Sequence, residues 1–401
     1  MIKFRSGLTA MTTLLLCSTL TGCWSSSPIE ERNLEVGIAL DTGTQSREEK
    51  RLQKRGGGYP KQELIRRTVQ FELPEAQGGS GSKDGPSQAK NFYNLEETGD
   101  SMMEITRETY LQTNSPAGFH LKTIIISSSL LSRIPMYELL DYFLRDNDIR
   151  LSLLIMISTG TASDVLEKTT VPGKVPTLAL KDLFDNRKRN SRMAKPLPLA
   201  KIIGPLKSNQ SFILPNVITT DHEIKVAGAG VIKGKTQKYA GFLSETEVEG
   251  LQWIKGDIAG GIVKETDPQS GKIIEYEIKS AKSKIQAIID GDDISFHVHM
   301  TSNGRIAESF KPAKNSGNNR LMAQETKWVE EKVNELAHNA AARMRELRVD
   351  VGGFGEALRI QHPEVWKKVK DDWDNAFVNI PVTYSTKIQI EDFGAAAMTV
   401  N

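Results

Sequence analysis

The stretch HLKTIIISSSLLSRIPMYELLDYFLRDNDIRLSLLIMI, residues 120–157, decides the fold of the first half of the chain. It opens with residues 120–127, whose three consecutive isoleucines predict a strand that is buried on both faces. Pro135 then suits the first turn of a helix, and residues 151–157 form a second apolar strand. Two buried strands joined by a helix require a parallel crossover, so this stretch predicts an α/β domain.

Further elements flank this stretch in the first half. Apolar patterns predict strands at residues 35–41 and 64–73, and a short helix at residues 161–168. Ser101 and Glu104 have the spacing of a capping box, which indicates where another helix, expected over about 101–113, begins.

Two loop-like segments interrupt the first half. Residues 45–60 are rich in Lys and Arg, and residues 74–90 are rich in Gly, Ser and Pro, so both are expected to be surface loops. The basic loop is either simply solvated or a contact for anionic lipid head groups. Because Glu48 and Glu49 lie among its cations, the solvated interpretation is favoured.

Residues 185–215 are expected to connect the two halves. Their prolines disrupt long regular elements, which predicts an extended linker or a small middle domain. The segment is also basic, through Arg187, Lys188, Arg189, Arg192, Lys195 and Lys201. These cations are either part of a solvated connector or a contact for anionic lipid or nucleic acid.

Residues 216–401 have a different order, in which strands come first and helices follow. A long apolar stripe predicts a helix over residues 321–348, and two shorter helices are expected after it, one over 353–360 and one beginning at Pro363. A last strand at residues 382–390 must rejoin a sheet begun much earlier, which makes this half an α+β domain. The earlier strands are expected at residues 222–232, 239–243, 261–263, 273–278, 283–289 and 294–301.

Two local signals refine this second half. Ser244 and Glu247 form a capping box at the start of a helix, with Leu243 and Val248 at the two positions of a hydrophobic staple. The helix that begins at Pro363 has an aromatic side, which we expect to be buried core, with a partner-binding face as the alternative. Its members are Trp366, Trp373 and Phe377.

The composition excludes several classes of protein. The chain has 401 residues, of which 38% are hydrophobic and 25% charged, as in an ordinary globular protein of two or three domains. Its 52 basic and 50 acidic residues nearly balance, so there is no bulk electrostatic reason to bind nucleic acid. Two cysteines exclude a disulfide scaffold. The expected fold is an α/β N-terminal domain plus an α+β C-terminal domain, with mixed and antiparallel sheets packed with helices.

The N-terminus has the organisation of an export signal. Lys3 and Arg5 precede a short apolar run at residues 8–20, which is too short to span a bilayer comfortably. The following residues, Leu20 to Cys23, resemble the bacterial lipobox. That resemblance implies cleavage after residue 22 and a diacylglyceryl thioether on Cys23, whose acyl chains would anchor the protein stably.

A plain secretory signal with an incidental cysteine is the alternative to this lipobox. No later stretch approaches the length of a membrane-spanning helix. The expected product is therefore a soluble body that is tethered by Cys23 to the outer face of the cell membrane.

A search for catalytic, cofactor or metal motifs finds little. Residues 228–234 superficially resemble a dinucleotide-binding loop, but the third glycine comes one residue late and a strand pattern surrounds it. His297 and His299 face the same side of a strand, with Asp292 and Asp293 nearby, yet no third ligand has convincing spacing. We therefore expect no catalytic, cofactor-binding or metal-binding residues.

Four stretches, taken in order, resemble the Ger(x)C family, the C-subunit lipoproteins of spore germinant receptors. Each motif is weak alone, but the ordered set behind a lipobox is specific and covers most of the mature chain. The loops at 45–60 and 74–90 are longer than this pattern leads us to expect. The matching residues are Cys23-Trp24 with Gly37–Asp41; His120–Lys122 with Leu144–Asp146 and Asp148–Arg150; Gly241–Glu247 with Gly250–Trp253; and Asp350–Gly352 with Leu358, Arg359, Pro363, Trp366, Trp373 and Phe377.

The resemblance implies a role that the residues alone do not supply. Members are non-catalytic, lipid-anchored subunits beside two integral-membrane receptor subunits in the inner membrane of the spore, where nutrients trigger germination. The alternatives are a lipid-anchored extracellular solute-binding protein, which needs two similar lobes around a cleft, and a cell-wall hydrolase, which needs a catalytic site. The expected organisation is a signal peptide at 1–22, an N-terminal germination-protein domain at 23–184, the connector at 185–215 and a C-terminal domain at 216–401.

Overall fold

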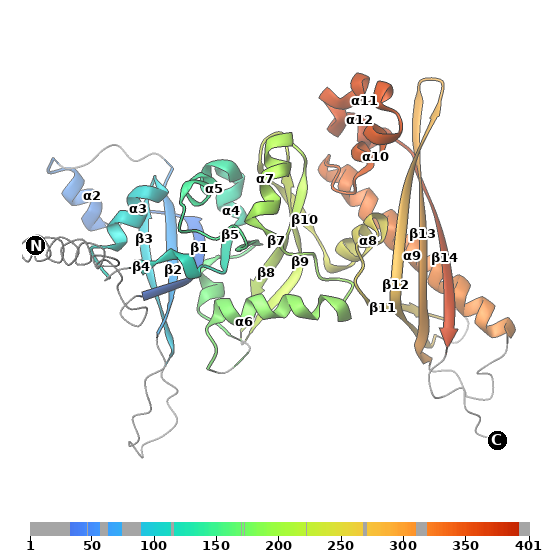
Figure 1. The fold of residues 1–401 in the computed structure, drawn as a ribbon, viewed down its shortest axis with the longest axis horizontal. Coiled ribbons are helices and arrows are strands. Elements are labelled where there is room, and N and C mark those ends of the chain that lie inside the picture. Colours follow the sequence, from blue (N-terminus) through green and yellow to red (C-terminus); the bar gives the residue numbers. More distant parts are fainter. Residues whose placement is uncertain are drawn as a thin grey trace, which may run out of the picture.

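The computed structural model describes residues 33–45, 47–56, 63–73, 90–113, 116–169, 171, 173–221, 223–267, 271–309 and 319–392. They form two β-sheets that follow one another along an elongated body, each packed with helices (Figure 1). Cys23 and nearly all of the loop at 74–90 lie outside the described residues. Among the described residues, no helix is both long and apolar enough to cross a bilayer.

The first sheet is mixed and has ten strands. Its main path runs β10-β9-β8-β6-β5-β1-β2-β3, with β4 beside β1 and β7 beside β6. β5 is parallel to both β1 and β6, which confirms the predicted crossover. The strands are β1 Asn33–Thr42, β2 Ile65–Glu72, β3 Phe92–Gly99, β4 Pro116–Ala117, β5 Thr123–Ser127, β6 Leu154–Ser158, β7 Leu197–Pro198, β8 Phe212–Thr219, β9 Ile224–Lys233 and β10 Lys238–Leu243.

Helices cover both faces of the first sheet. They are α3 Met102–Thr109, α4 Ser128–Arg133, α5 Met136–Arg145, α6 Pro176–Leu183 and α7 Leu199–Ser208, with the short 3₁₀ helices η2 Gly118–His120, η3 Ser163–Leu166 and η4 Phe184–Arg189. Ile124 and Ile126 pack into a core with α3, α4, α5 and α7. Ile125 points the other way, into a core with η3, α6 and η4. The strand is therefore buried on both faces, as its sequence predicts.

Residues 185–215, expected as a linker or small middle domain, are built into these layers instead. α7 packs Leu199, Ile202 and Leu206 into the core beneath Ile124, and β8 lies between β6 and β9. Pro198 only precedes α7, Pro215 lies at an irregularity in the pairing of β8 with β9, and Pro205 lies within α7 itself. β9 and β10, expected in the second domain, also belong to the first sheet.

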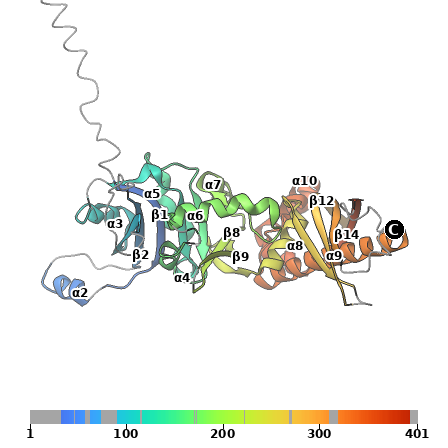
Figure 2. The same ribbon diagram turned by 90° about the horizontal axis from the view of Figure 1, so that it is seen from below.

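The basic segment at 45–60 is partly helical where it is described. α2, Arg47–Gln53, lies away from the sheets at one end of the body (Figures 1 and 2). Its Leu52 is exposed, so the helix buries little apolar surface.

The second sheet has four strands in the order β11-β12-β13-β14. They are β11 Gly261–Thr266, β12 Ile273–Asp290, β13 Asp293–Ser309 and β14 Val382–Asp392. The two strands expected at 273–278 and 283–289 are one long strand, β12, with an irregularity between Ile278 and Ser280. Gly291, with φ of 61°, makes the tight turn from β12 to β13. β14 rejoins the sheet, as expected, and pairs parallel to β13.

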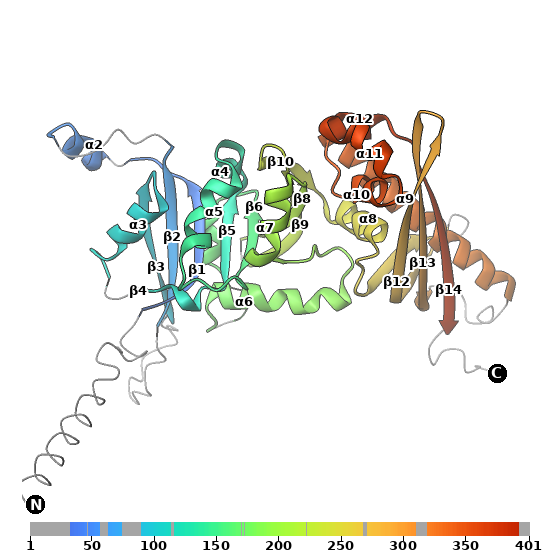
Figure 3. The same cartoon turned by 45° about the horizontal axis from the view of Figure 1, so that its top comes forward.

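Helices cover one face of the second sheet, and no helix among the described residues covers the other face (Figure 3). The helices are α9 Asn319–Leu347, α10 Phe354–Gln361, α11 Pro363–Val369, the 3₁₀ helix η6 Lys370–Asp372 and α12 Trp373–Asn379. Val329 and Val333 of α9 share a core with Phe296 and Val298 of β13. The helix expected from Pro363 is divided into α11, η6 and α12.

α8, Glu245–Lys255, lies between the two sheets. It starts at the predicted capping box: the backbone N–H of Ser244 donates to Glu247 at 2.7 Å, and that of Glu247 donates to the Ser244 hydroxyl at 3.3 Å. Leu243 and Val248 are fully buried in the core that α8 shares with β9, α9 and the second sheet. α8 therefore joins the two halves through apolar contacts.

Candidate functional site

Cys23, the predicted lipid attachment point, precedes the first described residue, Asn33, by ten positions. Its modification stays a prediction. The structure does show where the chain enters the body: Asn33 and Leu34 begin β1 and pair with Pro116 and Ala117 of β4.

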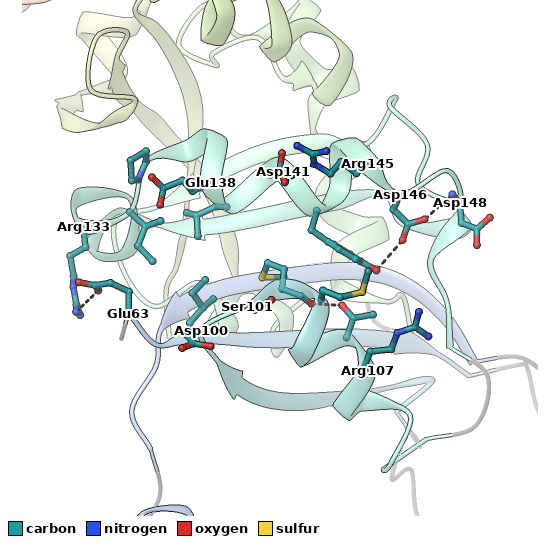
Figure 4. A pocket seen from close by; sticks show the side chains of 18 of the residues that line it. Glu63, Asp100, Ser101, Arg107, Arg133, Glu138, Asp141, Arg145, Asp146 and Asp148 are labelled. Carbon is teal, nitrogen blue, oxygen red and sulfur yellow. Dashed lines mark hydrogen bonds and ion pairs between the residues drawn. The ribbon is translucent and has the colours of Figure 1, made fainter. Parts of the chain in front are cut away.

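A groove of about 950 Å³ lies between α3 and α5 (Figure 4). Apolar side chains such as Met102, Ile134 and Leu139 line part of it. Its carboxylates outnumber its guanidinium groups, so it is electrostatically suited to a cationic group rather than to an anion. The charged lining residues are Glu63, Asp100, Glu138, Asp141, Asp146 and Asp148, with Arg107, Arg133 and Arg145.

Several of the charges in this groove are tied to one another. Arg133 lies 2.6 Å from Glu63, and Arg145 lies 2.8 Å from Asp141, whose pKa is lowered by that hydrogen bond. The hydroxyl of Tyr142 donates to Asp146 at 2.9 Å, and burial raises the pKa of Tyr142 to about 12. The described lining includes no histidine or cysteine, and its carboxylates are the side chains that could act as a base.

His297 and His299, the best metal candidates from the sequence, face the same side of β13 but bind hydroxyl groups of β14. Nδ1 of His297 lies 2.8 Å from the hydroxyl of Thr383, and its Nε2 lies 2.8 Å from that of Ser385. Nδ1 of His299 lies 2.9 Å from the same Ser385 hydroxyl. Within the described part of the chain, no three His, Cys, Asp or Glu side chains are grouped so that they could hold a metal ion.

Lysines surround this histidine pair on the open face of the second sheet. Lys284 is directly opposite His299, and Lys282 and Lys387 lie on either side of Thr301. All three lysines are exposed, and within the described residues they have no ion-pair partner. This cationic face, made of Lys282, Lys284 and Lys387 around the two histidines, takes its positive charge from the three lysines and could meet an acidic surface.

The basic connector is held against α8 and is not wholly available to an external ligand. Arg187 donates to the side chain of Gln252 at 2.9 Å and to the backbone oxygen of Asp257 at 2.6 Å. Lys195 also lies 3.5 Å from the Asp257 carboxylate. These cations therefore join the two halves of the chain, a role that their sequence pattern did not reveal.

Glu249 is the buried centre of the same junction. Its side chain accepts hydrogen bonds from the Ser191 hydroxyl at 2.9 Å and from Nε of Arg192 at 3.2 Å. Burial raises the pKa of Glu249, although the bonds to Ser191 and Arg192 oppose this shift. The sequence placed Glu249 one turn into a predicted helix but gave no sign that it was buried.

A second polar cluster that the sequence did not reveal lies behind β1 and β2. The side chain of the fully buried Gln70 donates to the backbone oxygen of Leu166 at 2.6 Å and accepts from the backbone N–H and the hydroxyl of Thr177 at 3.0 and 2.7 Å. Thr177 approaches so closely because Gly37 has no side chain: a Cβ there would lie 2.1 Å from the Thr177 hydroxyl oxygen. Gly37, the first residue of the Gly37–Asp41 motif, therefore has a packing role.

The aromatic side of the last helices is core, as its spacing predicted. Trp373 and Phe377 are buried, and the half-buried Trp366 packs edge-on against Trp373 with ring centroids 5.3 Å apart. The alternative of a free partner-binding face is therefore not supported for Trp373 and Phe377.

Comparison with known proteins gives matches along nearly the whole chain. Residues 25–219 match the family model "Spore germination protein N-terminal domain", and residues 227–394 match "Spore germination B3/GerAC like, C-terminal". In Bacillus subtilis (strain 168), spore germination protein YndF is 38% identical over 401 residues, covering 98% of each chain. Spore germination protein B3 is 28% identical, covering 98% of this chain and 99% of its own.

A solved structure shares the fold. The structure titled "Crystal Structure of the GerBC protein" superposes with a TM-score of 0.59 at 24% identity, covering 82% of this chain and 94% of that one. Because both family models match in order and the curated relatives align from end to end, the chain belongs to the Ger(x)C family of spore germination proteins.

Proposed function

We propose that this protein is a non-enzymatic, lipid-anchored subunit of a nutrient germinant receptor and is needed for spore germination. The observation that carries the proposal is its end-to-end likeness to spore germination proteins. The lipobox-like residues that end at Cys23 support the lipid anchor in this proposal.

On this proposal the protein lies on the outer face of the cell membrane, which becomes the inner membrane of the spore, beside integral-membrane receptor subunits. A lipid on Cys23 would raise the effective concentration near those subunits, so each contact surface can be modest. The cationic face of the second sheet is a surface suited to an acidic region of such a partner.

A lipid-anchored solute-binding protein is the alternative function. Such proteins bind solute in a cleft between two similar lobes, whereas this chain has a ten-stranded mixed sheet in one half and a four-stranded sheet in the other. The groove between α3 and α5 is the feature that would serve this alternative, and it lies within one half of the chain.

A complementation experiment tests the proposal. Spores that lack this gene would receive wild type, Cys23→Ala or Cys17→Ala, and both the nutrient-triggered fall in optical density and the incorporation of labelled palmitate would be measured. Cys17→Ala is the matched control because that residue lies in the segment expected to be removed. We expect only Cys23→Ala to lose palmitate and most of the nutrient response.

Two results would contradict the proposal. A normal nutrient response from Cys23→Ala spores, with the protein still in the membrane fraction, would argue against the anchor. Saturable binding of an amino acid or sugar by the purified protein, lost when the α3–α5 groove is altered by Arg107→Ala, would favour the solute-binding alternative.

A further inference from the structure

We propose that the turn after α3 is a second membrane contact, which places Tyr110 and Leu111 in the interface of the lipid bilayer. The inference deepens the proposed function and rests on it, because it takes the lipid on Cys23 as the first contact. It concerns the end of the body at which the chain enters β1.

Tyr110 and Leu111 present large apolar surfaces to solvent. Leu111 is 86% exposed, more than any other large hydrophobic side chain among the described residues, and Tyr110 is 51% exposed. Tyrosine is enriched at membrane–water interfaces because its ring is apolar and its hydroxyl is polar. The pair is therefore well suited to the boundary between head groups and acyl chains.

The fold holds these side chains outward. Met102, Ile105 and Thr109 form the buried side of α3; just beyond its end, Tyr110 lies at the rim of the α3–α5 groove and Leu111 is turned to solvent. The hydroxyl of Thr109 accepts a hydrogen bond from the buried Arg67 at 3.2 Å and donates to the backbone oxygen of Ile105 at 3.0 Å. Leu111 could turn inward only if Thr109, which is held by these two hydrogen bonds, left the core.

The turn lies beside the point where the chain enters the body. The side chain of Asn33 donates to the hydroxyl of Thr113 at 2.8 Å, two residues beyond Leu111, and Figure 1 shows the end of α3 near the start of the described chain. Residues 24–32 separate Cys23 from Asn33, which allows ten Cα steps. At about 3.3–3.6 Å per residue, Asn33, which is bonded to the end of this turn, is held within roughly 35 Å of the lipid attachment point.

Two cations, Lys122 and Arg150, lie at the same end beside carboxylates that include Asp146 and Asp148 of the groove, so the apolar pair rather than net charge carries the proposed contact. The backbone N–H of Lys122 donates to Val36 of β1 at 2.9 Å, and Arg150 is exposed nearby. The pKa of His120 is lowered, first by burial and then by the positive charges of Lys122 and Arg150, while the carboxylate of Glu72 opposes this shift. Basic side chains close to a membrane are attracted to anionic lipids.

The test uses full-length lipidated protein bound to vesicles of phosphatidylcholine and phosphatidylglycerol in equal parts. Leu111→Cys supplies the single free thiol of the mature chain, because Cys17 is removed and Cys23 is modified on the proposed function. The thiol would carry an environment-sensitive fluorophore, and nitroxides on the acyl chains would quench it. Ile360→Cys is the matched control, an isoleucine that is 65% exposed in α10, at the other end of the body.

We expect severalfold stronger quenching and a blue-shifted emission at position 111 relative to position 360. Equal quenching at both positions, while the protein stays bound to the vesicles, would overturn the inference. Shielding of position 111 only when membrane partner subunits are added would also overturn it, because the turn would then be a protein contact.

Mass spectrometry of the same preparation separates this inference from the proposed function. If Cys23 carries no lipid, the proposed anchor is wrong, and the fluorophore is then placed on a chain that also carries Cys23→Ser, so that position 111 keeps the single free thiol on the same vesicles. Quenching at position 111 would then still support a membrane-contacting turn, and its absence would overturn it.

Discussion

The indole N–H of Trp373 donates to the carboxylate of Asp350 at 3.0 Å and so joins the start of α12 to the loop before α10. The same carboxylate accepts four backbone N–H groups at the beginning of α10. A negative charge there satisfies donors that a helix N-terminus leaves without partners and interacts favourably with the helix dipole. The four donors are Gly352 at 3.0 Å, Gly353 at 2.9 Å, Phe354 at 3.2 Å and Gly355 at 2.6 Å.

Replacing this carboxylate should destabilise the C-terminal half. We expect Asp350→Ala to lower the free energy of unfolding by about 2–4 kcal/mol, because hydrogen bonds to a charged group are strong and their donors would be left without partners. Urea unfolding followed by tryptophan fluorescence measures the change. Asp371→Ala, which removes an exposed carboxylate nearby, is the control and should stay within about 0.5 kcal/mol of wild type. An equal effect of both substitutions would contradict a special role for Asp350.

The junction between β10 and α8 gives a second prediction. Ser244→Ala removes the hydroxyl that accepts the Glu247 N–H and should cost about 0.5–2 kcal/mol of stability. Thr246→Ala is the matched control, since the Thr246 hydroxyl caps no backbone N–H among the described residues. Thermal melting compares the two, and superposable curves for Ser244→Ala and wild type would show that the capping box contributes nothing.

Local signals predicted much of the fold because they act over a few residues. The run of isoleucines at 124–126 and the capping box at Ser244 both have causes in neighbouring side chains. Which sheet a strand joins, by contrast, is decided by its pairing with residues far away in the sequence. β9 and β10 alternate like any antiparallel pair, and only the pairing of β8 with β6, at Ile157 and Asn216, assigns them to the first sheet.

The sequence offered a site prediction only where it carried a contiguous motif. Cys23 and the preceding residues are such a motif, whereas the groove between α3 and α5 gathers residues from Glu63 to Asp148 that no spacing rule connects. Burial of a polar residue was equally hidden. Gln70 and Glu249 look like ordinary strand and helix residues until the partners that satisfy them, Thr177 and Ser191, are brought near by the fold.

The contact between Gly37 and Thr177 gives a third prediction. Gly37→Ala would place a methyl group in contact with the Thr177 side chain and disturb its bonds to Gln70, which should cost about 1–3 kcal/mol. Thr177→Ala in the same chain should restore part of that loss by making room. Gly204→Ala, in α7 where a Cβ meets open space, is the control and should be neutral or stabilising by up to about 1 kcal/mol. No rescue by Thr177→Ala would mean that crowding is not the cause.

Burial of Glu249 makes the stability of the junction depend on pH. Because its pKa is raised in the folded protein, the folded state binds the proton of Glu249 more tightly than the unfolded state does. This contribution to stability is fully present below the ordinary pKa, about 4.5, and is lost as pH rises through the higher pKa of the folded state. Other groups add their own dependence, so the effect of Glu249 is seen as a difference between variants.

Glu249→Gln should remove that dependence, because glutamine keeps the shape of the protonated side chain and can still accept from Ser191. We expect the stability of the variant relative to wild type to increase as pH rises from about 4.5 through the folded-state pKa and then to level off. Urea unfolding at a series of pH values measures this difference. Glu364→Gln, at a side chain that is 80% exposed, should give a difference that barely changes with pH. A difference for Glu249→Gln that is equally flat would show that burial does not shift the ionisation of Glu249 in the folded protein.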